Sequence, residues 1–270
     1  MRINYHVHSR CSFDAEYSLV EMCRSAVAMG ITHLCLTDHC DLIDGEGNPF
    51  DSFDWKKEDA ELHAARTAFP DLKISRGIEL GQAIMRPEAA NRVLSESGID
   101  FVLGSMHNCR TGIDYYYIKY VDSIQCSMLL EDYLNSLLEL AGTDWFDSLA
   151  HLTYPIRYMR ARDGIAIDFH PFDDLVREIL KTLVERGKAL ELNTSGYRTN
   201  QGEPLPPEYM IRMYRDLGGE LITIGSDAHE PKHMDDGLEE GMALLRRCGF
   251  CYITMYQNRI PKQIRLEEML

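Results

Sequence analysis

The stretch RINYHVH, residues 2–8, is the first indication of the fold of this chain. It is a strand-length run that ends in two histidines, His6 and His8, separated by one residue. Side chains two positions apart on a strand point to the same side, so both imidazoles are expected to face one point. Histidines add little to a hydrophobic core, and the pair therefore indicates partners that lie later in the sequence.

Further short apolar runs follow along the chain, and helix-length segments separate most of them. They are HLCLTDH (33–39), KISRGIEL (73–80), DFVLGSMH (100–107), DSLAH (147–151), ALELNTS (189–195), LITIGSDAH (221–229) and, as a weaker candidate, FCYITMY (250–256). The segment SLVEMCRSAVAMG (18–30) shows the helical pattern, with Ser18 and Glu21 at capping-box spacing. Alternation of this kind is typical of a single α/β domain built from parallel β-α units.

The composition indicates a globular enzyme or binding protein. The chain has 270 residues, of which 45% are hydrophobic and 26% charged, and its net charge of −15 argues against binding extended nucleic acid. No apolar run approaches the ~20 residues that cross a bilayer, and no signal peptide is apparent, so we expect no membrane partner and a cytoplasmic protein with reduced cysteines. The acidic stretch at residues 40–59 is expected to form a functional loop. The oligomeric state stays open.

Residues with metal-binding chemistry stand at the ends of the strand-like runs, joined by one aspartate in the loop after the first run. Carboxyl ends of strands share one face of a closed parallel barrel, so these donors should converge. If these side chains bind metal ions with about three donors to each ion, every ion keeps coordination positions for water and substrate, as in catalytic metal sites. The nine candidate ligands are His6, His8, Asp14, His39, Glu79, His107, His151, Asp227 and His229.

Two other patterns near these runs have simpler explanations. Asp38 should face away from His39 by strand alternation, so we expect it to support the ligands or to cap a turn. The segment DFH (168–170) resembles a ligand pair but is expected to form the turn that enters the next helix. Mixed imidazole and carboxylate donors suit Zn²⁺, Mn²⁺ or Fe²⁺ rather than Ca²⁺, and the sequence does not choose among the three metals.

The motifs HVH, TDH, SMH and SDAH, found between residues 6 and 229, resemble those of the polymerase and histidinol phosphatase (PHP) superfamily. The resemblance implies a distorted TIM-like (β/α)7 barrel, with one PHP-type metal-dependent phosphoesterase domain over residues 1–270. It also implies three divalent metal ions as cofactors. Their ligands would be His6, His8, Glu79 and Asp227 for the first ion, Glu79, His107 and His151 for the second, and Asp14, His39 and His229 for the third. Asp14 replaces the histidine that some relatives carry.

Within the superfamily, the chain is similar to the stand-alone histidinol-phosphate phosphatases. The segments AHLTYPIRYMR (150–160) and ELNTSGYR (191–198) fit that branch. The similarity implies that Arg157 and Arg198 bind phosphate and that Asp41 meets the amine or imidazole of the substrate. Catalysis would involve the ligands Glu79, Asp227 and His229.

The expected reaction is the hydrolysis of L-histidinol phosphate to L-histidinol and phosphate, a step of histidine biosynthesis. The partner is therefore a small phosphorylated substrate. Three alternatives stay open: hydrolysis of nucleotides or oligonucleotides, hydrolysis of phosphotyrosine, and a metal-binding barrel without catalytic activity.

Overall fold

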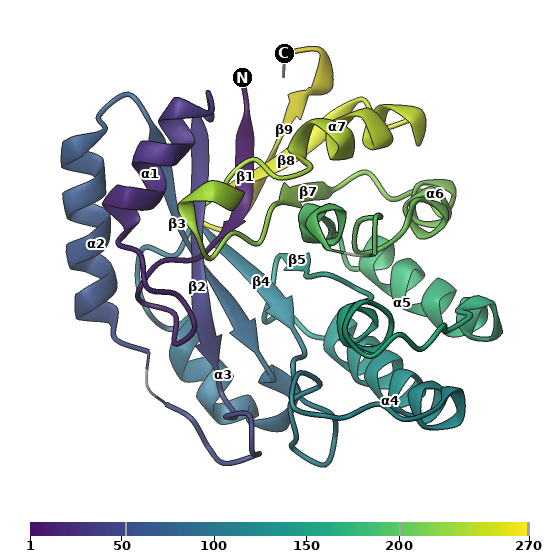
Figure 1. Cartoon of the computed structure of the whole chain (residues 1–270). Coiled ribbons are helices and arrows are strands. Elements are labelled where there is room, and N and C mark those ends of the chain that lie inside the picture. Colours follow the sequence, from purple (N-terminus) through teal and green to yellow (C-terminus); the bar gives the residue numbers. More distant parts are fainter. Residues whose placement is uncertain (52, 200, 269–270) are drawn as a thin grey trace.

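The protein is a parallel barrel surrounded by helices, described here from a computed structural model that covers residues 1–51, 53–199 and 201–268 (Figure 1). Seven strands pair in chain order, and every pairing is parallel. They are β1 (Ile3–Val7), β2 (His33–Asp41), β3 (Lys73–Gly81), β4 (Phe101–Ser105), β5 (Ser148–Leu149), β6 (Ala189–Asn193) and β7 (Ile222–Gly225). The predicted α/β class with a seven-stranded, TIM-like barrel is confirmed.

The barrel closes between β1 and the segment that follows β7. The backbone N–H of Asp227 donates to the His6 carbonyl at 2.9 Å, and that of His8 donates to the Ala228 carbonyl at 2.9 Å. Val7 and Ala228 form a parallel bridge at the same place. Closure therefore occurs at the carboxyl ends of the strands, where the predicted ligands lie.

Among the described residues, seven α-helices cover the barrel, with α1 and α2 on one side and α4, α5 and α6 on the other (Figure 1). Their bounds are α1 Leu19–Ala28, α2 Trp55–Ala68, α3 Pro87–Leu94, α4 Ser123–Ala141, α5 Asp173–Glu185, α6 Glu208–Asp216 and α7 Leu238–Arg247. The capping box predicted at the start of α1 is present, since Ser18 and Glu21 each bond the other's backbone N–H. No helix in the described ranges is long and apolar enough to span a membrane.

The weak strand candidate at residues 250–256 forms a hairpin outside the barrel. Strands β8 (Tyr252–Gln257) and β9 (Ile260–Arg265) pair antiparallel. Tyr256 packs against Phe101 inside the barrel, with ring centroids 5.0 Å apart, and its N–H donates to the Tyr5 hydroxyl at 3.2 Å. Because β1 already closes the ring on the β7 side, this strand has no barrel edge to join. It covers the amino ends of the strands instead.

The predicted loop at residues 40–59 is shorter than expected. Strand β2 continues to Asp41, because it pairs with β3 along its whole length, and α2 begins at Trp55 with Asp54 as its N-cap. Residue 52 of this stretch lies outside the described residues. The DFH segment forms the predicted helix entry: the Asp168 carboxylate accepts from the N–H of His170 just before α5 begins.

Candidate metal centre

Glu79 lies at the centre of the face formed by the carboxyl ends of the strands. It is near the end of β3 and is 1% exposed. Its Oε1 lies 3.1 Å from Nε2 of His107 and 2.9 Å from Nε2 of His151, and its Oε2 lies 3.1 Å from Nδ1 of His39. One carboxylate therefore touches imidazoles that follow or end three different strands.

His6 on β1 and His8, directly after the end of that strand, approach the same carboxylate. Their Nε2 atoms lie 3.3 and 3.6 Å from Oε2 of Glu79, and 3.7 and 3.5 Å from Oδ1 of Asp227. Both imidazoles are fully buried. The prediction that they share one side of the strand agrees with this geometry.

Asp14 folds back from the loop after β1 and lies on the outer side of the cluster. Its Oδ2 is 3.5 Å from Nε2 of His39 and 3.2 Å from Nε2 of His229. The His229 ring stacks on His8 with centroids 3.9 Å apart. All nine predicted ligands thus lie in one continuous cluster.

Asp227 and His229 reach the cluster from beyond a strand, although the sequence places them at the end of the strand-like run LITIGSDAH (221–229). Strand β7 ends at Gly225, so alternation along a strand does not set their directions. Asp227 has a left-handed backbone with φ 54°, which is uncommon for a non-glycine residue and typical of functional turns. Gly225 permits the close approach, because a Cβ there would lie 2.2 Å from the Cβ of His6.

The donors fit divalent cations. Nε2 of His8, Nδ1 of His39 and Nε2 of His229 are buried, and each lies within 3.1–3.5 Å of a carboxylate oxygen without the geometry of a hydrogen bond to any described residue. Four triads keep their donor atoms within 4.8 Å of one another. They are His6–His8–Asp227, His6–Glu79–His151, His39–Glu79–His107 and His8–His39–His229. Such mixed nitrogen and oxygen sets suit Zn²⁺, Mn²⁺ or Fe²⁺.

The electrostatics of the cluster keep its carboxylates charged. Burial alone would raise the pKa of Glu79 and of Asp227, but the surrounding histidines, with Arg157 beside Asp227, hold both pKa values well below their usual range. Burial, with His229 and His39 nearby, lowers the pKa of His8 well below its ordinary value. The cluster therefore offers anionic oxygens beside a neutral imidazole, which is the form that binds a metal.

Glu191 on β6 belongs to the site and was not predicted. It is 1% exposed, its Oε1 lies 2.6 Å from Nδ1 of His6, and its Oε2 accepts the backbone N–H of His151 at 2.8 Å. It thus orients one predicted ligand through the ring and another through the backbone. The signal in the sequence is a carboxylate inside the otherwise apolar run ALELN, where burial without a partner would be costly.

Asp38 supports the cluster from behind, as predicted. Its carboxylate accepts from the N–H of Ser9 at 2.6 Å and from the hydroxyl of Ser12 at 2.7 Å. The Ser12 hydroxyl in turn lies 3.0 Å from Nδ1 of His8. This chain of contacts fixes the ring of His8 while leaving Nε2 directed at the cluster.

The three predicted substrate contacts all border the cluster. Arg157 donates to Oδ2 of Asp227 at 2.8 Å, and its buried Nε has no partner among the described residues. Arg198 donates to the Asp227 carbonyl at 2.7 Å. Asp41 is 7% exposed and lies 3.2 Å from Nδ1 of His107, so it contacts a predicted ligand in this structure. Contact of these side chains with a substrate stays a prediction.

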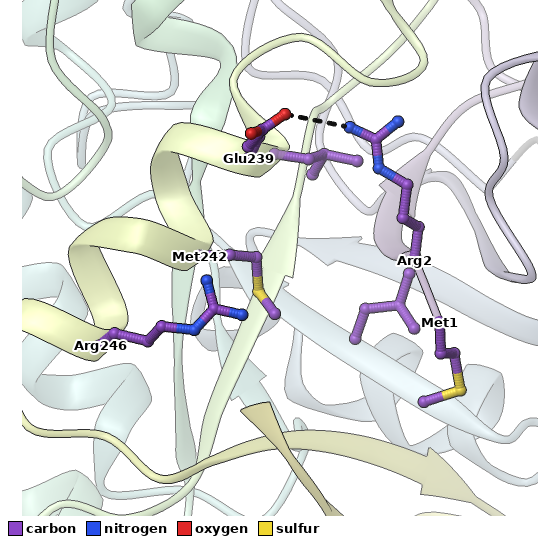
Figure 2. A pocket seen from close by; sticks show the side chains of 7 residues that line it. Met1, Arg2, Glu239, Met242 and Arg246 are labelled. Carbon is purple, nitrogen blue, oxygen red and sulfur yellow. Dashed lines mark ion pairs between the residues drawn. The ribbon is translucent and has the colours of Figure 1, made fainter. Parts of the chain in front are cut away.

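A separate pocket of about 330 Å³ lies at the other end of the barrel, around the start of β1 (Figure 2). Arg2 pairs with Glu239 at 3.8 Å, and Figure 2 marks this ion pair together with Met242 and Arg246 of α7, which line the same pocket. Arg246 also donates to the Leu266 carbonyl at 3.0 Å. These contacts tie α7 to the two ends of the described chain, far from the histidine cluster.

Comparisons with known proteins agree with this geometry. A probable histidinol-phosphatase of Thermotoga maritima is 32% identical over 253 residues, which cover 94% of this chain and 95% of that protein. The histidinol-phosphatase of Lactococcus lactis is 28% identical over 264 residues, covering 95% of each chain.

Structural and family comparisons give the same result. The crystal structure of histidinol phosphate phosphatase from Lactococcus lactis, complexed with zinc, L-histidinol and phosphate, matches with a TM-score of 0.83 at 25% identity and covers 97% of this chain and 98% of that one. The structure of a Listeria monocytogenes protein described as a putative histidinol phosphatase shares the fold, with a TM-score of 0.77 at 17% identity. The PHP domain model matches residues 4–195. This chain therefore belongs to the PHP domain family.

Proposed function

We propose that this protein is a metal-dependent histidinol-phosphate phosphatase, which hydrolyses L-histidinol phosphate to L-histidinol and phosphate in histidine biosynthesis. The observation that carries the proposal is the convergence of six histidines and two aspartates around Glu79, with Arg157 at the edge of the cluster. Relatives at 28–32% identity over nearly the whole chain bear that name, and one matching structure holds zinc, L-histidinol and phosphate. In this proposal the phosphoesterase domain spans residues 1–270.

Three divalent ions, Zn²⁺, Mn²⁺ or Fe²⁺, would be held as the resemblance implies. Their ligands would be His6, His8, Glu79 and Asp227 for the first, Glu79, His107 and His151 for the second, and Asp14, His39 and His229 for the third. When bound, the ions would supply Lewis-acid stabilisation of the phosphoryl oxygens and would acidify water. Glu79, Asp227 and His229, the proposed catalytic residues, would act by holding this arrangement.

The residues of the chain itself would recognise both ends of the substrate. The unpartnered Nε–H of Arg157 can donate to a phosphoryl oxygen while its other nitrogen stays on Asp227. Arg198 would donate to the same phosphate from the opposite segment. Asp41 lies across the cluster beside His107 and would attract the amine or imidazole of the substrate. In this proposal the arginines face the phosphate of histidinol phosphate, and Asp41 faces its cationic end.

The compartment proposed for the reaction is the cytoplasm. All eight cysteines are free, and only Cys11 and Cys251 are not buried. Free thiols in this number are typical of a reducing compartment.

The proposal is tested with four substrates assayed in parallel on metal-loaded protein: L-histidinol phosphate, phosphotyrosine, a nucleoside 3′,5′-bisphosphate and single-stranded DNA. We expect L-histidinol phosphate to have the highest kcat/KM. Two histidine substitutions are compared. His8→Ala should abolish turnover, whereas the control His63→Ala, at an exposed position on α2, should leave turnover unchanged. Preference for any other substrate, or full activity of His8→Ala, contradicts the proposal.

A further inference from the structure

The outer face of α4 changes from apolar to polar along its length. This helix lies on the outside of the barrel beside α5 (Figure 1). Its exposed positions at helical spacing are Ile124, Met128, Glu131, Asn135 and Glu139. The last three are polar, as expected for a helix face in water. Ile124 and Met128, by contrast, are 72% and 68% exposed. The first half of α4 therefore presents large apolar side chains to solvent.

The loop before α4 extends this apolar surface. Ile113 is 38% exposed and Val121 is 64% exposed. Ile113, Ile124 and Met128 line one groove of about 650 Å³, and Val121 directly precedes another lining residue, Asp122. We call the four apolar residues, Ile113, Val121, Ile124 and Met128, the α4 patch. Single exposed hydrophobic residues need no explanation, but a group of them around one groove indicates a surface that binds a partner.

The α4 patch has the area that a dimer interface needs. At the exposures given, its four side chains offer roughly 400 Å² of accessible surface. Homodimer interfaces are about 65% apolar, so this area corresponds to roughly 600 Å² of interface on each partner. Two copies then reach about 1,200 Å², the lower limit for a specific, stable interface. Tyr116 and Tyr117, which are 53% and 66% exposed just before the groove-lining Ile118, add aromatic surface.

The distribution of charge favours a second copy of the chain as the partner. The net charge of −15 makes two copies repel each other over most of their surface. Residues 113–128 hold two acidic side chains and one basic side chain, a net charge of only −1. The two carboxylates that line the groove already accept backbone N–H groups, Asp122 from Gln125 at 2.8 Å and Asp132 from Arg110 at 2.9 Å. Repulsion between copies is therefore weak at this surface.

We propose that the α4 patch is the interface of a two-fold symmetric homodimer, in which the patch of one chain packs against the same patch of another. A two-fold interface must be complementary to itself. An apolar surface meets this condition, because it needs no group of opposite charge on the partner. Ile124 and Met128 of each copy cover the groove of the other.

The dimer would also hold a segment that belongs to the metal centre. The chain between β4 and α4 carries both His107 and the first half of the α4 patch. Arg162, at the end of the π-helical turn Arg157–Arg162, donates to the backbone carbonyls of Tyr116 and Ile118 in this segment. Docking of a second copy therefore restrains one metal ligand and, through Arg162, the turn that carries Arg157.

The test is sedimentation velocity of metal-loaded protein from about 1 to 100 µM, because we expect a dissociation constant in the micromolar range. The mass should rise from that of one 31.0 kDa chain to twice that value. Ile124→Glu places a charge in the interface and should raise the dissociation constant at least roughly 30-fold, the effect of losing one hot-spot residue. The matched control is Ile260→Glu, the same change at a 63% exposed position on β9, which should dimerise like the wild type.

Three results would overturn the inference. A wild-type protein that stays monomeric at about 100 µM has no such interface. A monomer that instead binds phosphatidylcholine vesicles uses the patch for a membrane. An equal rise of the dissociation constant in Ile124→Glu and Ile260→Glu shows that added charge, not the α4 patch, controls association.

Thermal unfolding provides a second readout and a check of folding. The wild-type midpoint should rise with protein concentration, whereas the Ile124→Glu midpoint should not, because only a dimer gains stability by mass action. At the lowest concentration the two midpoints should coincide, since Ile124 is exposed in the single chain. None of these measurements uses a substrate, so their outcome does not depend on the proposed function.

Discussion

Glu191→Gln is the most informative change at the metal centre, because it keeps the shape of the side chain and removes one hydrogen-bond acceptor. The two carboxylate oxygens of Glu191 face two nitrogen atoms, Nδ1 of His6 at 2.6 Å and the backbone N–H of His151 at 2.8 Å. A carboxamide has a single oxygen, so it can accept from one of these groups while its NH₂ faces the other.

The expected loss of metal affinity follows from the hydrogen bond that the carboxamide cannot form. A buried donor left without an acceptor costs about 1–3 kcal/mol, and loss of a residue that orients a metal ligand lowers metal affinity about 10–100-fold. The two ranges agree, because each factor of ten corresponds to about 1.4 kcal/mol. We therefore expect Glu191→Gln to bind metal roughly 10–100-fold more weakly, with a matching fall in kcat/KM when metal is limiting.

The assay is chelator competition followed by elemental analysis, with kcat/KM measured over a series of metal concentrations. Asp147→Asn is the matched control: Asp147 is a buried carboxylate that accepts the Val102 N–H at 2.9 Å and binds Arg259, at the amino end of β5. It should lower the thermal midpoint without changing metal affinity. Wild-type affinity in Glu191→Gln, or equal metal loss in both variants, would refute the reasoning.

Three further predictions concern the same site. His8→Ala should lose metal, measured by elemental analysis, and should lower kcat by more than ~100-fold. This exceeds the ~100-fold loss expected when a residue that only orients a metal ligand is removed. Arg157→Lys keeps the charge but not the planar fork, so steady-state kinetics should show a KM increase of roughly 10-fold with metal content unchanged. The pKa of His107 is raised to about 10, because Asp41 and Glu79 outweigh burial, and the pKa of His39 is also raised. Metal binding at neutral pH should therefore release protons, and affinity should fall as pH falls. Calorimetry in buffers of different ionisation enthalpy measures this release, and an absence of released protons would contradict it.

Much of the fold was predictable because its signals are local. Period-two runs, helical segments between them and the capping box at Ser18 each depend on residues close in sequence. The positions of Glu79 and His107 at strand ends followed from the same runs. In a parallel barrel, strand ends share one face, so the convergence of distant donors needed only the architecture.

Contacts between distant segments were not predictable in the same way. The pairing of Glu191 with His6 requires β6 and β1 to direct side chains into one barrel, which no local pattern specifies. Asp227 enters the site through a left-handed turn rather than along a strand. The strand expected at residues 250–256 is present as β8, but an apolar run does not reveal that it would pair with β9 outside the barrel.

The sequence by itself determined the order of β-α units and the types of donor at their ends, because both depend on short-range periodicity and residue chemistry. The tertiary structure alone decided which carboxylate orients which histidine, and it alone brought the left-handed turn at Asp227 against β1. Those features depend on side-chain distances of a few ångströms between strands and loops far apart in the chain, and such distances exist only after the barrel has closed.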